Sequence, residues 1–351
     1  MGLFRNVVDR LRAREEPPSG PLTADGRLAS DLWLDQPNAG VEIAARVRRG
    51  VVSESEGASL LHFAEQGYLV EELDIEPHVF ADVEAALARL WREKPGNVAF
   101  AYQSILKPFA YADEAAHRRP SYRIADLHAT CEAALGLYLH PRIHRYVELI
   151  LGAAPVATQS LYFEYGSQQA LHRDPVFVQT QPPSHLVAAW IALEDIHPDS
   201  GPLVYVPGSH HLPYYQLAAG EHRFDHKRHG EAEIRAMETF DRQQMEQRGL
   251  SVVPFTPRRG RVLIWHHSLL HGGSLPSDPA RTRKSFVVHF STRQNYHRLK
   301  QTYLQQVATA SGVVERPRII ETERVLAAGG CAGFASPLVE HPFLPSDFFA
   351  G

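Results

Sequence analysis

Cysteine is scarce in this chain. Its 351 residues include only Cys131 and Cys331, which lie far apart in the sequence. This excludes a scaffold held together mainly by disulfides. The N-terminal residues also lack the apolar run of a secretory leader. We therefore expect a reducing, cytoplasmic environment.

Blocks of like charge and long hydrophobic runs are missing as well. The net charge is −4 and the pI is about 6.6, so nothing favours nucleic acid or an anionic membrane as a partner. Apolar residues recur at helical spacing over residues 3–11, but this segment is too short to span a bilayer. We expect no nucleic-acid partner and no stable membrane insertion, and leave a homo-oligomer open.

Three common catalytic motifs are absent too: no G-x-S-x-G, no P-loop and no Rossmann glycine pattern occurs. Histidine, in contrast, is abundant, with 20 copies. This abundance justifies a search for metal ligands, and it also raises the number of coincidental histidine spacings.

Hydrophobic periodicity divides the chain into regions. Residues 1–52 are predicted to form an N-terminal helix and an extended arm, because residues 15–50 are punctuated by proline and glycine. Helical patterns follow at 53–66, 77–94 and 141–151, with a short strand at 68–70. Residues 317–351 are assigned to a C-terminal tail.

From about Val156 the period changes to two, in short runs rich in Val, Ile, Tyr, Phe and Trp that turn residues separate. Helices followed by many antiparallel strands predict a mostly β fold with flanking helices, a sandwich or barrel within residues 53–316. An insertion at about 214–250 is charged, is predicted to be helical, and is a candidate lid.

The stretch "ALHRDPV" carries His172 and Asp174, whose side chains would share one face of a strand. A third ligand is available at His271, where a strand gives way to a glycine turn. Two histidines and one carboxylate on one face of an octahedral ion leave positions open for substrate, cosubstrate and O2. This arrangement is typical of Fe(II) oxygenases.

Arg283 and Ser285 follow His271 closely, and strand alternation places them on one face, opposite Phe286, Val288 and Phe290. A guanidinium beside a hydroxyl is a receptor for a carboxylate. A metal site with an arginine anchor favours an acidic cosubstrate that also chelates the metal, and 2-oxoglutarate meets this requirement.

These residues resemble the phytanoyl-CoA dioxygenase family. The resemblance covers roughly residues 53–292 and includes "HFAEQGYLVEE", His172-x-Asp174, "WIALEDIHPDSGPLVYVPGSHH", "LLHGG" and "RTRKSFVVHF". It implies a double-stranded β-helix (a cupin-like jelly roll) and dioxygenase activity that uses Fe(II), 2-oxoglutarate and O2.

The resemblance also implies roles for individual residues. His172, Asp174 and His271 match the iron ligands, Arg283 matches the 2-oxoglutarate anchor with Ser285 beside it, and Trp190 matches a position lining the cosubstrate pocket. Related halogenases have Ala or Gly at the carboxylate position, so Asp174 favours hydroxylation of an unactivated C–H bond in a small or medium-sized substrate. Gln159 and Tyr162 are further pocket candidates, although strand alternation admits only one of them.

Other residues compete with these assignments. His222, His226 and His229 have zinc-like spacing on a predicted helical face but lack a nearby general base, and a solvated face or lid is favoured. His140 and His144 are assigned to a solvated helix face or lid in the same way. His210 and His211 are assigned to a turn whose loop could border the active-site mouth, and His266 and His267 to core or hydrogen-bonding roles. Arg281 is the alternative anchor. The second function considered is a non-catalytic jelly roll that binds a metal or small molecule.

Overall fold

The computed structural model describes residues 22–93, 99–102, 105–108, 123–125, 127, 131–178, 180–218, 220–225, 228–292, 294–295, 304–309, 312–317 and 320–321. The predicted helix at 3–11 and the tail beyond residue 321 lie outside these ranges. Pro317, placed in the tail from sequence, ends a strand, and residues 320–321 pair with the main sheet.

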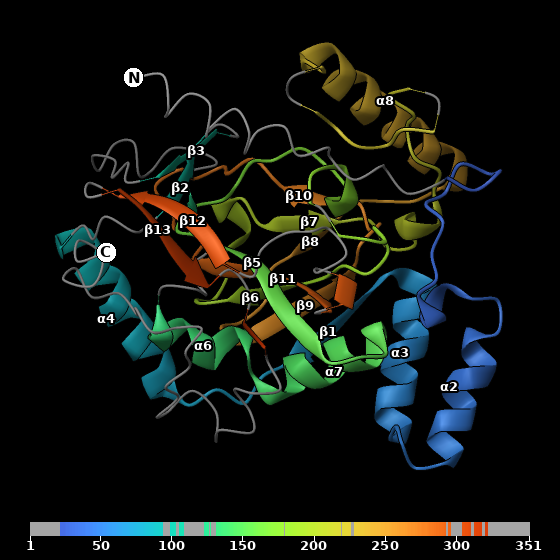
Figure 1. Cartoon of the computed structure of the whole chain (residues 1–351), viewed down its shortest axis with the longest axis horizontal. Helices are drawn as coiled ribbons and strands as arrows, with labels where there is room; N and C mark the ends of the chain where they lie inside the picture. Colours follow the sequence, from blue (N-terminus) through green and yellow to red (C-terminus); the bar gives the residue numbers. More distant parts are fainter. Residues whose placement is uncertain are drawn as a thin grey trace.

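Helices dominate the first half of the described chain (Figure 1). The 3-10 turn η1 precedes five α-helices, namely α2 (Ala39–Arg48), α3 (Glu54–Gln66), α4 (Pro77–Glu93), α6 (Glu132–Tyr138) and α7 (Pro141–Leu151). In α3 the Ser53 side chain accepts from the Glu56 amide while Glu56 accepts from the Ser53 amide, and Gly67 ends the helix at φ 80°. The predicted helices at 53–66, 77–94 and 141–151 are confirmed.

The expectation of an extended arm up to residue 52 is wrong for residues 39–48, which form α2. Its N-cap, Asn38, makes no side-chain capping bond, and Gly40 lies in its first turn. The sequence does carry an N-cap residue here, but Pro37 and Gly40 on either side of it led to the prediction of an arm.

Among the described residues, antiparallel strands make up three sheets. The nine-stranded sheet has the order β1-β9-β6-β11-β5-β4-β2-β3, with β14 beside β5. A three-stranded sheet has the order β10-β7-β8, and β12 pairs with β13. The strands are β1 (Tyr68–Glu72), β2 (Ala99–Tyr102), β3 (Ile105–Pro108), β4 (Arg123–Ala125), β5 (Pro155–Phe163), β6 (Val187–Ala192), β7 (Leu203–Tyr205), β8 (Val253–Phe255), β9 (Arg261–His266), β10 (His271–Gly273), β11 (Ser285–Thr292), β12 (Leu304–Thr309), β13 (Gly312–Pro317) and β14 (Ile320–Glu321).

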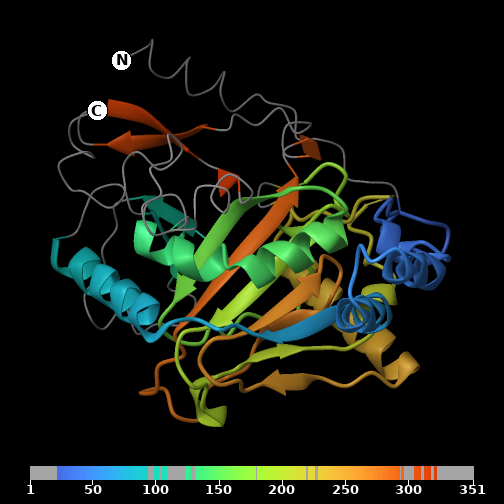
Figure 2. The same ribbon diagram turned by 90° about the horizontal axis from the view of Figure 1, so that it is seen from below.

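The large sheet is buried on both faces. Alternate residues of β6 and β11, such as Ile191 and Phe286, pack with the helices into one core. Trp190, Trp265 and Val287 point the other way and form a second core with the small sheet. Figure 1 shows α4, α6 and α7 below the strands of the large sheet and the small sheet above them, and in Figure 2 α7 lies in front of those strands. This is the predicted jelly roll, with helices covering one face.

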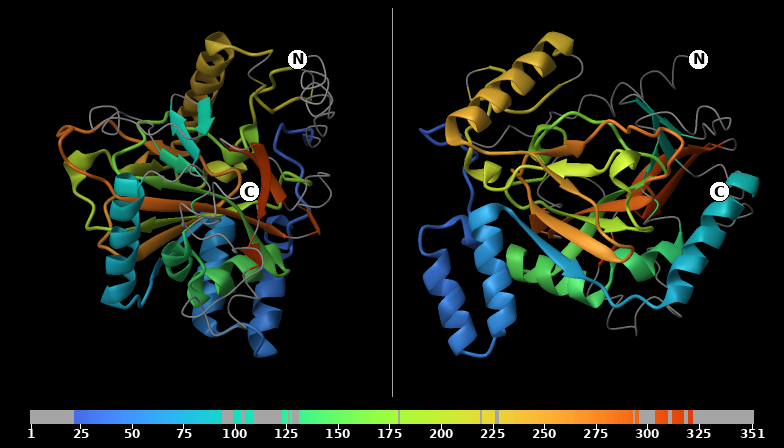
Figure 3. Two further views of the ribbon diagram at one scale, coloured as in Figure 1. Left: turned by 60° about the vertical axis from the view of Figure 1, so that its left-hand side comes forward. Right: turned by 180° about the vertical axis from the view of Figure 1, so that it is seen from behind.

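The insertion after β7 contains α8 (Glu231–Arg248), which confirms the predicted helix. It lies apart from the other helices, on the far side of the strands (Figure 3). Among the described helices, none is both long and apolar enough to cross a bilayer.

Candidate metal and cosubstrate site

The backbones of His172 and His271 are hydrogen-bonded to each other. The His172 amide donates to the His271 carbonyl at 2.9 Å, and the His271 amide donates to the His172 carbonyl at 3.1 Å. Their ring centroids are 4.4 Å apart. The main chain therefore places the two imidazoles side by side.

In both imidazoles the Nε2 atom is available as a metal ligand. Nδ1 lies 2.9 Å from the Ala170 carbonyl in His172 and 3.0 Å from the Leu269 carbonyl in His271. Because a carbonyl oxygen only accepts, each Nδ1 carries the proton and each Nε2 keeps its lone pair. Tautomers fixed in this way are typical of metal-binding histidines.

Asp174 completes this cluster, but not from a strand. The predicted alternation of His172 and Asp174 in one strand is wrong, because His172 forms an isolated bridge and Asp174 begins the 3-10 turn η3 (Asp174–Val176). One ligand atom from each of His172, Asp174 and His271 lies within 4.8 Å of the others. The turn thus brings the carboxylate to the two imidazoles.

Two neighbours hold the Asp174 carboxylate. Trp265 Nε1–H donates to Oδ2 at 2.8 Å, and His289 Nε2 lies 3.4 Å from Oδ1. Burial raises the pKa of Asp174, but His271 and His289 outweigh it and bring this pKa below its usual value. Burial and then His271 lower the pKa of His172 to about 3. At neutral pH an ionised carboxylate and a neutral imidazole are present, the forms that bind metals.

Arg283 lies in the same cavity as the cluster. The cavity has a volume of about 60 Å³, and its lining includes His172, Asp174, His271, Trp190 and Arg283. The Arg283 guanidinium carbon is 5.4 Å from the centroid of the Phe163 ring and 5.5 Å from that of Trp190. Burial lowers the pKa of Arg283 to about 10, so the side chain remains a cation at neutral pH.

Several buried donors near Arg283 lack a partner. Among the described residues, Arg283 Nε, Ser285 Oγ and Trp190 Nε1 make no hydrogen bond. Ser285 precedes Val287 and His289 on the face of β11 that borders the cavity. Buried donors are normally satisfied, so this group is suited to an anionic ligand.

The two further pocket candidates, Gln159 and Tyr162, lie on opposite faces of β5. Leu161 and Phe163 line the cavity, so Gln159 shares their face, although it is not part of the lining. Tyr162 lies on the other face, where it packs against Phe286 and its hydroxyl donates to Glu164 at 3.3 Å. The structure does not bring Tyr162 to the cluster.

The sequence reasoning missed Trp265 and His289. Alternation in "RKSFVVHF" places His289 on the face of Ser285 and could have identified it. Trp265 had no such signal, because 91 residues separate it from Asp174.

The competing residues have other surroundings. The predicted helical face of His222 and His229 is wrong, since neither lies in a helix; His226 is outside the described residues. The His140 ring accepts from the Arg142 amide at the start of α7. Arg281 lies at the surface, paired with Asp278.

A second cavity, of about 310 Å³, borders the cluster. It shares Gln169 and His172 with the first. Its outer wall comes from the insertion and is mostly apolar, formed by Tyr214, Tyr215, His222, Ile234, Met237, Glu238 and Asp241. A buried ion pair, Arg173 Nη2–Asp241 Oδ1 at 2.9 Å, joins α8 to the residue between His172 and Asp174.

Curated relatives match part of the chain. A phytanoyl-CoA dioxygenase domain-containing protein 1 homolog of Caenorhabditis elegans is 26% identical over 158 residues, which cover 43% of this chain and 52% of the relative. The peroxisomal phytanoyl-CoA dioxygenase of Bos taurus is 24% identical over 163 residues, or 43% and 44% of the two chains. The chain thus spans about half the length of these relatives.

Distant similarity to solved structures was also found. EctD from S. alaskensis with 2-oxoglutarate and 5-hydroxyectoine is 17% identical, with a TM-score of 0.49 over 81% of this chain and 86% of that one. The epimerase SnoN from nogalamycin biosynthesis is 20% identical, with a TM-score of 0.46 over 73% and 84%. The phytanoyl-CoA dioxygenase family model matches residues 63–282, more than half of the 351 residues, and the chain therefore belongs to the phytanoyl-CoA dioxygenase family.

Proposed function

We propose that this chain is an Fe(II)- and 2-oxoglutarate-dependent dioxygenase that hydroxylates an unactivated C–H bond of a small or medium-sized organic substrate. Succinate and CO2 are the coproducts. The observation that carries the proposal is the cluster of two lone-pair Nε2 atoms and one carboxylate beside a buried guanidinium.

The donor set suits Fe(II). His172, Asp174 and His271 would hold the ion through two nitrogens and one oxygen, and this triad leaves coordination positions open. When bound, the iron and 2-oxoglutarate together activate O2 and supply the oxidant for the C–H bond. Trp265 and His289 keep the Asp174 carboxylate in place by contacting its two oxygens.

Arg283 would pair with the far carboxylate of 2-oxoglutarate. Its side chain is 2% exposed and lies between the Phe163 and Trp190 rings, in a cavity that also borders the ligand cluster. Ser285 and Trp190 offer further donors that have no partner among the described residues. Low exposure strengthens such charge-assisted bonds and keeps bulk water away from the metal.

The second cavity would receive the substrate. It reaches His172 on one side and α8 on the other, and its wall combines Val176, Phe177 and Met237 with the polar His222 and Glu238. A mainly apolar cavity with a few polar groups is typical of small-molecule sites. The insertion would act as a lid over this cavity. Asp174 supports hydroxylation, because its carboxylate occupies the position that halogenases leave open for chloride.

Succinate formation from 2-oxoglutarate tests the enzyme. With Fe(II), ascorbate and O2 we expect slow turnover without substrate, and background levels only in the Asp174→Ala variant. Binding of 2-oxoglutarate, measured by equilibrium dialysis without O2, should require the metal and weaken in Arg283→Gln. Metal binding without 2-oxoglutarate binding or succinate would instead support a non-catalytic jelly roll.

A further inference from the structure

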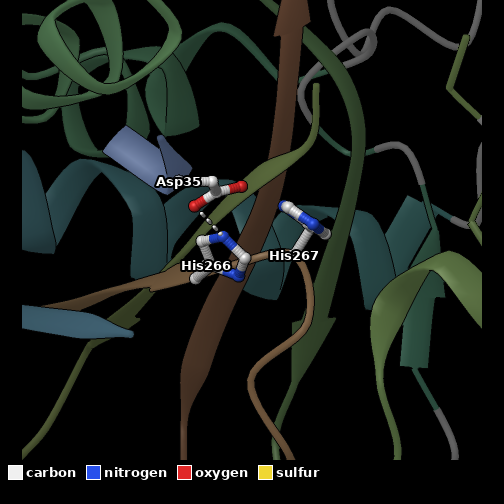
Figure 4. Close-up of side chains that lie close together, drawn as sticks. All are labelled: Asp35, His266 and His267. Atoms are coloured by element: carbon white, nitrogen blue, oxygen red, sulfur yellow. Dashed lines mark hydrogen bonds and ion pairs between the residues drawn. The ribbon is translucent and has the colours of Figure 1, made fainter. Parts of the chain in front are cut away.

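One buried histidine outside the ligand cluster is satisfied within the protein. Asp35 ends η1 (Trp33–Asp35), and the Nε2–H of His266 donates to its Oδ1 at 2.9 Å (Figure 4). His266 Nδ1 accepts from the Ser268 amide at 3.1 Å. Both ring nitrogens therefore have partners, which agrees with the hydrogen-bonding role predicted for His266.

His222, in the insertion, has the opposite character. It is 1% exposed, and neither Nδ1 nor Nε2 has a hydrogen-bond partner in the described part of the chain. Together with His172 it lines the cavity of about 310 Å³. Buried polar groups are normally hydrogen-bonded, because each unpaired one opposes folding. A histidine that is buried, unpaired and borders a cavity is therefore suited to a ligand.

The neighbours of His222 hold its ring without bonding to its nitrogens. The Tyr214 ring lies edge-on, with the two ring centroids 5.5 Å apart, and the Tyr214 hydroxyl is hydrogen-bonded to Ser268 Oγ at 2.7 Å. Two residues after His222, the Phe224 amide donates to the Val176 carbonyl at 3.1 Å. Val176 ends η3, so the main chain ties His222 to the turn that begins in the ligand cluster.

The imidazole of His222 is uncharged at neutral pH. Burial, and then the positive charge of Arg223, lower its pKa to about 4, although Glu221 opposes them. A neutral imidazole carries one N–H and one lone pair, and no described neighbour determines which nitrogen of His222 holds the proton. In His172 and His271, by contrast, backbone carbonyls determine the tautomer. His222 can therefore present either a donor or an acceptor to a ligand.

The cavity around His222 favours a neutral ligand. Its described lining includes two arginines and two acidic residues, namely Arg123, Arg173, Glu238 and Asp241. These charges balance, and the neutral imidazole adds none, so this lining selects neither an anion nor a cation. A hydroxyl group both donates and accepts through a single atom, and it suits either tautomer of His222, whereas an ether or a ketone only accepts.

We propose that His222 binds a hydroxyl group of the substrate, and that the substrate is a neutral, mainly apolar molecule carrying this hydroxyl. This inference rests on the proposed function, which assigns the second cavity to the substrate. His222 would determine specificity, because a molecule that lacks the hydroxyl leaves the imidazole buried and unpaired.

Binding of two matched probes to the full chain, without iron and without 2-oxoglutarate, tests this role. The probes are 2-naphthol and 2-methylnaphthalene, which differ by a hydroxyl in place of a methyl group, and equilibrium dialysis gives both dissociation constants. His222→Leu removes both ring nitrogens but keeps an apolar side chain. We expect this substitution to weaken binding of 2-naphthol by about 10-fold relative to 2-methylnaphthalene.

His211→Leu is the matched control, because His211 is exposed and is not among the described residues that line the cavity. It should keep the wild-type ratio of the two dissociation constants. Thermal unfolding without a probe should show His222→Leu to be at least as stable as the wild type, since an apolar side chain replaces an unpaired imidazole. A less stable variant would indicate a structural partner of His222 and would count against the proposal.

An unchanged ratio in His222→Leu, or no binding of 2-naphthol to the wild type up to its solubility limit, would overturn the proposal. Neither measurement uses iron, so this outcome would leave the dioxygenase, which is tested by succinate formation, untouched. Conversely, if the wild type forms no succinate but the ratio changes in His222→Leu as expected, the dioxygenase proposal fails and the hydroxyl site stands.

Discussion

At the scale of single residues, the indole of Trp265 binds one oxygen of Asp174 and leaves the other facing His271 and His289. Because each oxygen has its own neighbours, the orientation of the carboxylate is fixed. A carboxylate that keeps its charge but loses this donor can rotate away from the two imidazoles.

Replacing Trp265 by Phe should weaken Fe(II) binding about 10- to 100-fold, because a smaller aromatic ring remains while the donor to Asp174 is lost. Anaerobic titration with Fe(II) measures the effect. Trp91→Phe, on α4, is the control and should bind as the wild type does. Equal affinity in Trp265→Phe would rule out a positioning role for this indole.

Without a bound ligand, the buried Arg283 side chain lowers the free energy of unfolding. Among the described residues no ion pair with Arg283 is found, and burial of an unpaired guanidinium opposes folding. Arg283→Met should therefore stabilise the ligand-free protein by about 1–3 kcal/mol and abolish the stabilisation by 2-oxoglutarate.

Thermal unfolding with Fe(II), with and without 2-oxoglutarate, measures both effects. The exposed Arg281→Met is the control, expected to change stability by less than about 0.5 kcal/mol and to keep the response to 2-oxoglutarate. A strong loss of stability in Arg283→Met would show that the guanidinium has a structural partner.

At the scale of elements, α8 is joined to the residue before η3 by the buried pair of Arg173 and Asp241. Burial raises the pKa of Asp241, whereas the positive charge of Arg173 lowers it, and the net effect is a raised pKa. The desolvation penalty of this carboxylate is therefore larger than its attraction to Arg173. Arg173 also lies over the Tyr214 ring at 4.4 Å and donates to the Pro213 carbonyl. The pair therefore specifies where α8 docks rather than adding much stability.

Asp241→Leu alone should cost about 3–5 kcal/mol, because it leaves Arg173 buried and unpaired. Arg173→Met/Asp241→Leu should return to within about 2 kcal/mol of the wild type, as measured by urea unfolding. Glu231→Gln, in an exposed pair with Arg235 on the same helix, is the control and should have little effect. A double variant as unstable as the single one would contradict this account.

Most helices and strands could be predicted from sequence, because the burial of one face of an element produces a periodic pattern of apolar residues. Strands β5, β6, β9 and β11 lie where runs of Val, Ile and aromatic residues occur, and helix α3 has both its cap and its terminal glycine. Helix α2 was missed although Asn38 stands at its N-cap, because proline and glycine punctuate residues 15–50. The prediction that His172 and Asp174 lie close together agrees with the structure. In the structure, however, Asp174 is placed by a 3-10 turn, which a period-two strand pattern does not predict.

Strand alternation assigns residues to two opposite faces, but it does not indicate which of the two faces borders the site. This is why Gln159 and Tyr162 could not be separated from sequence. The partners of a buried polar residue are still harder to predict, since 231 residues separate Asp35 from His266. Such pairs depend on how whole layers pack, which local patterns do not encode.

At the scale of the whole molecule, one sheet is covered on both faces while the insertion remains peripheral. Every residue of β6 and β11 is buried, whereas α8 buries only Met237, Asp241 and Met245 over its 18 residues. Local opening requires less free energy where fewer apolar contacts are lost.

Hydrogen exchange followed by mass spectrometry should therefore rank the segments. Peptides from β6 and β11 should exchange slowest, and those from α8 markedly faster. Helix α4 is a comparison of similar length that buries Phe80, Val83, Leu87 and Leu90, and it should exchange more slowly than α8. Equal protection of α4 and α8 would argue against a lid that opens independently.

The paired backbones of His172 and His271 have an evolutionary consequence. Because main-chain hydrogen bonds in both directions set the spacing of the two imidazoles, that spacing does not depend on the side chains of the surrounding cavity. Mutations that reshape the wall from Tyr214 to Asp241 can accumulate without displacing the two histidines. A new substrate can then be acquired by exchanging wall residues alone, which makes this wall the region to randomise in directed evolution.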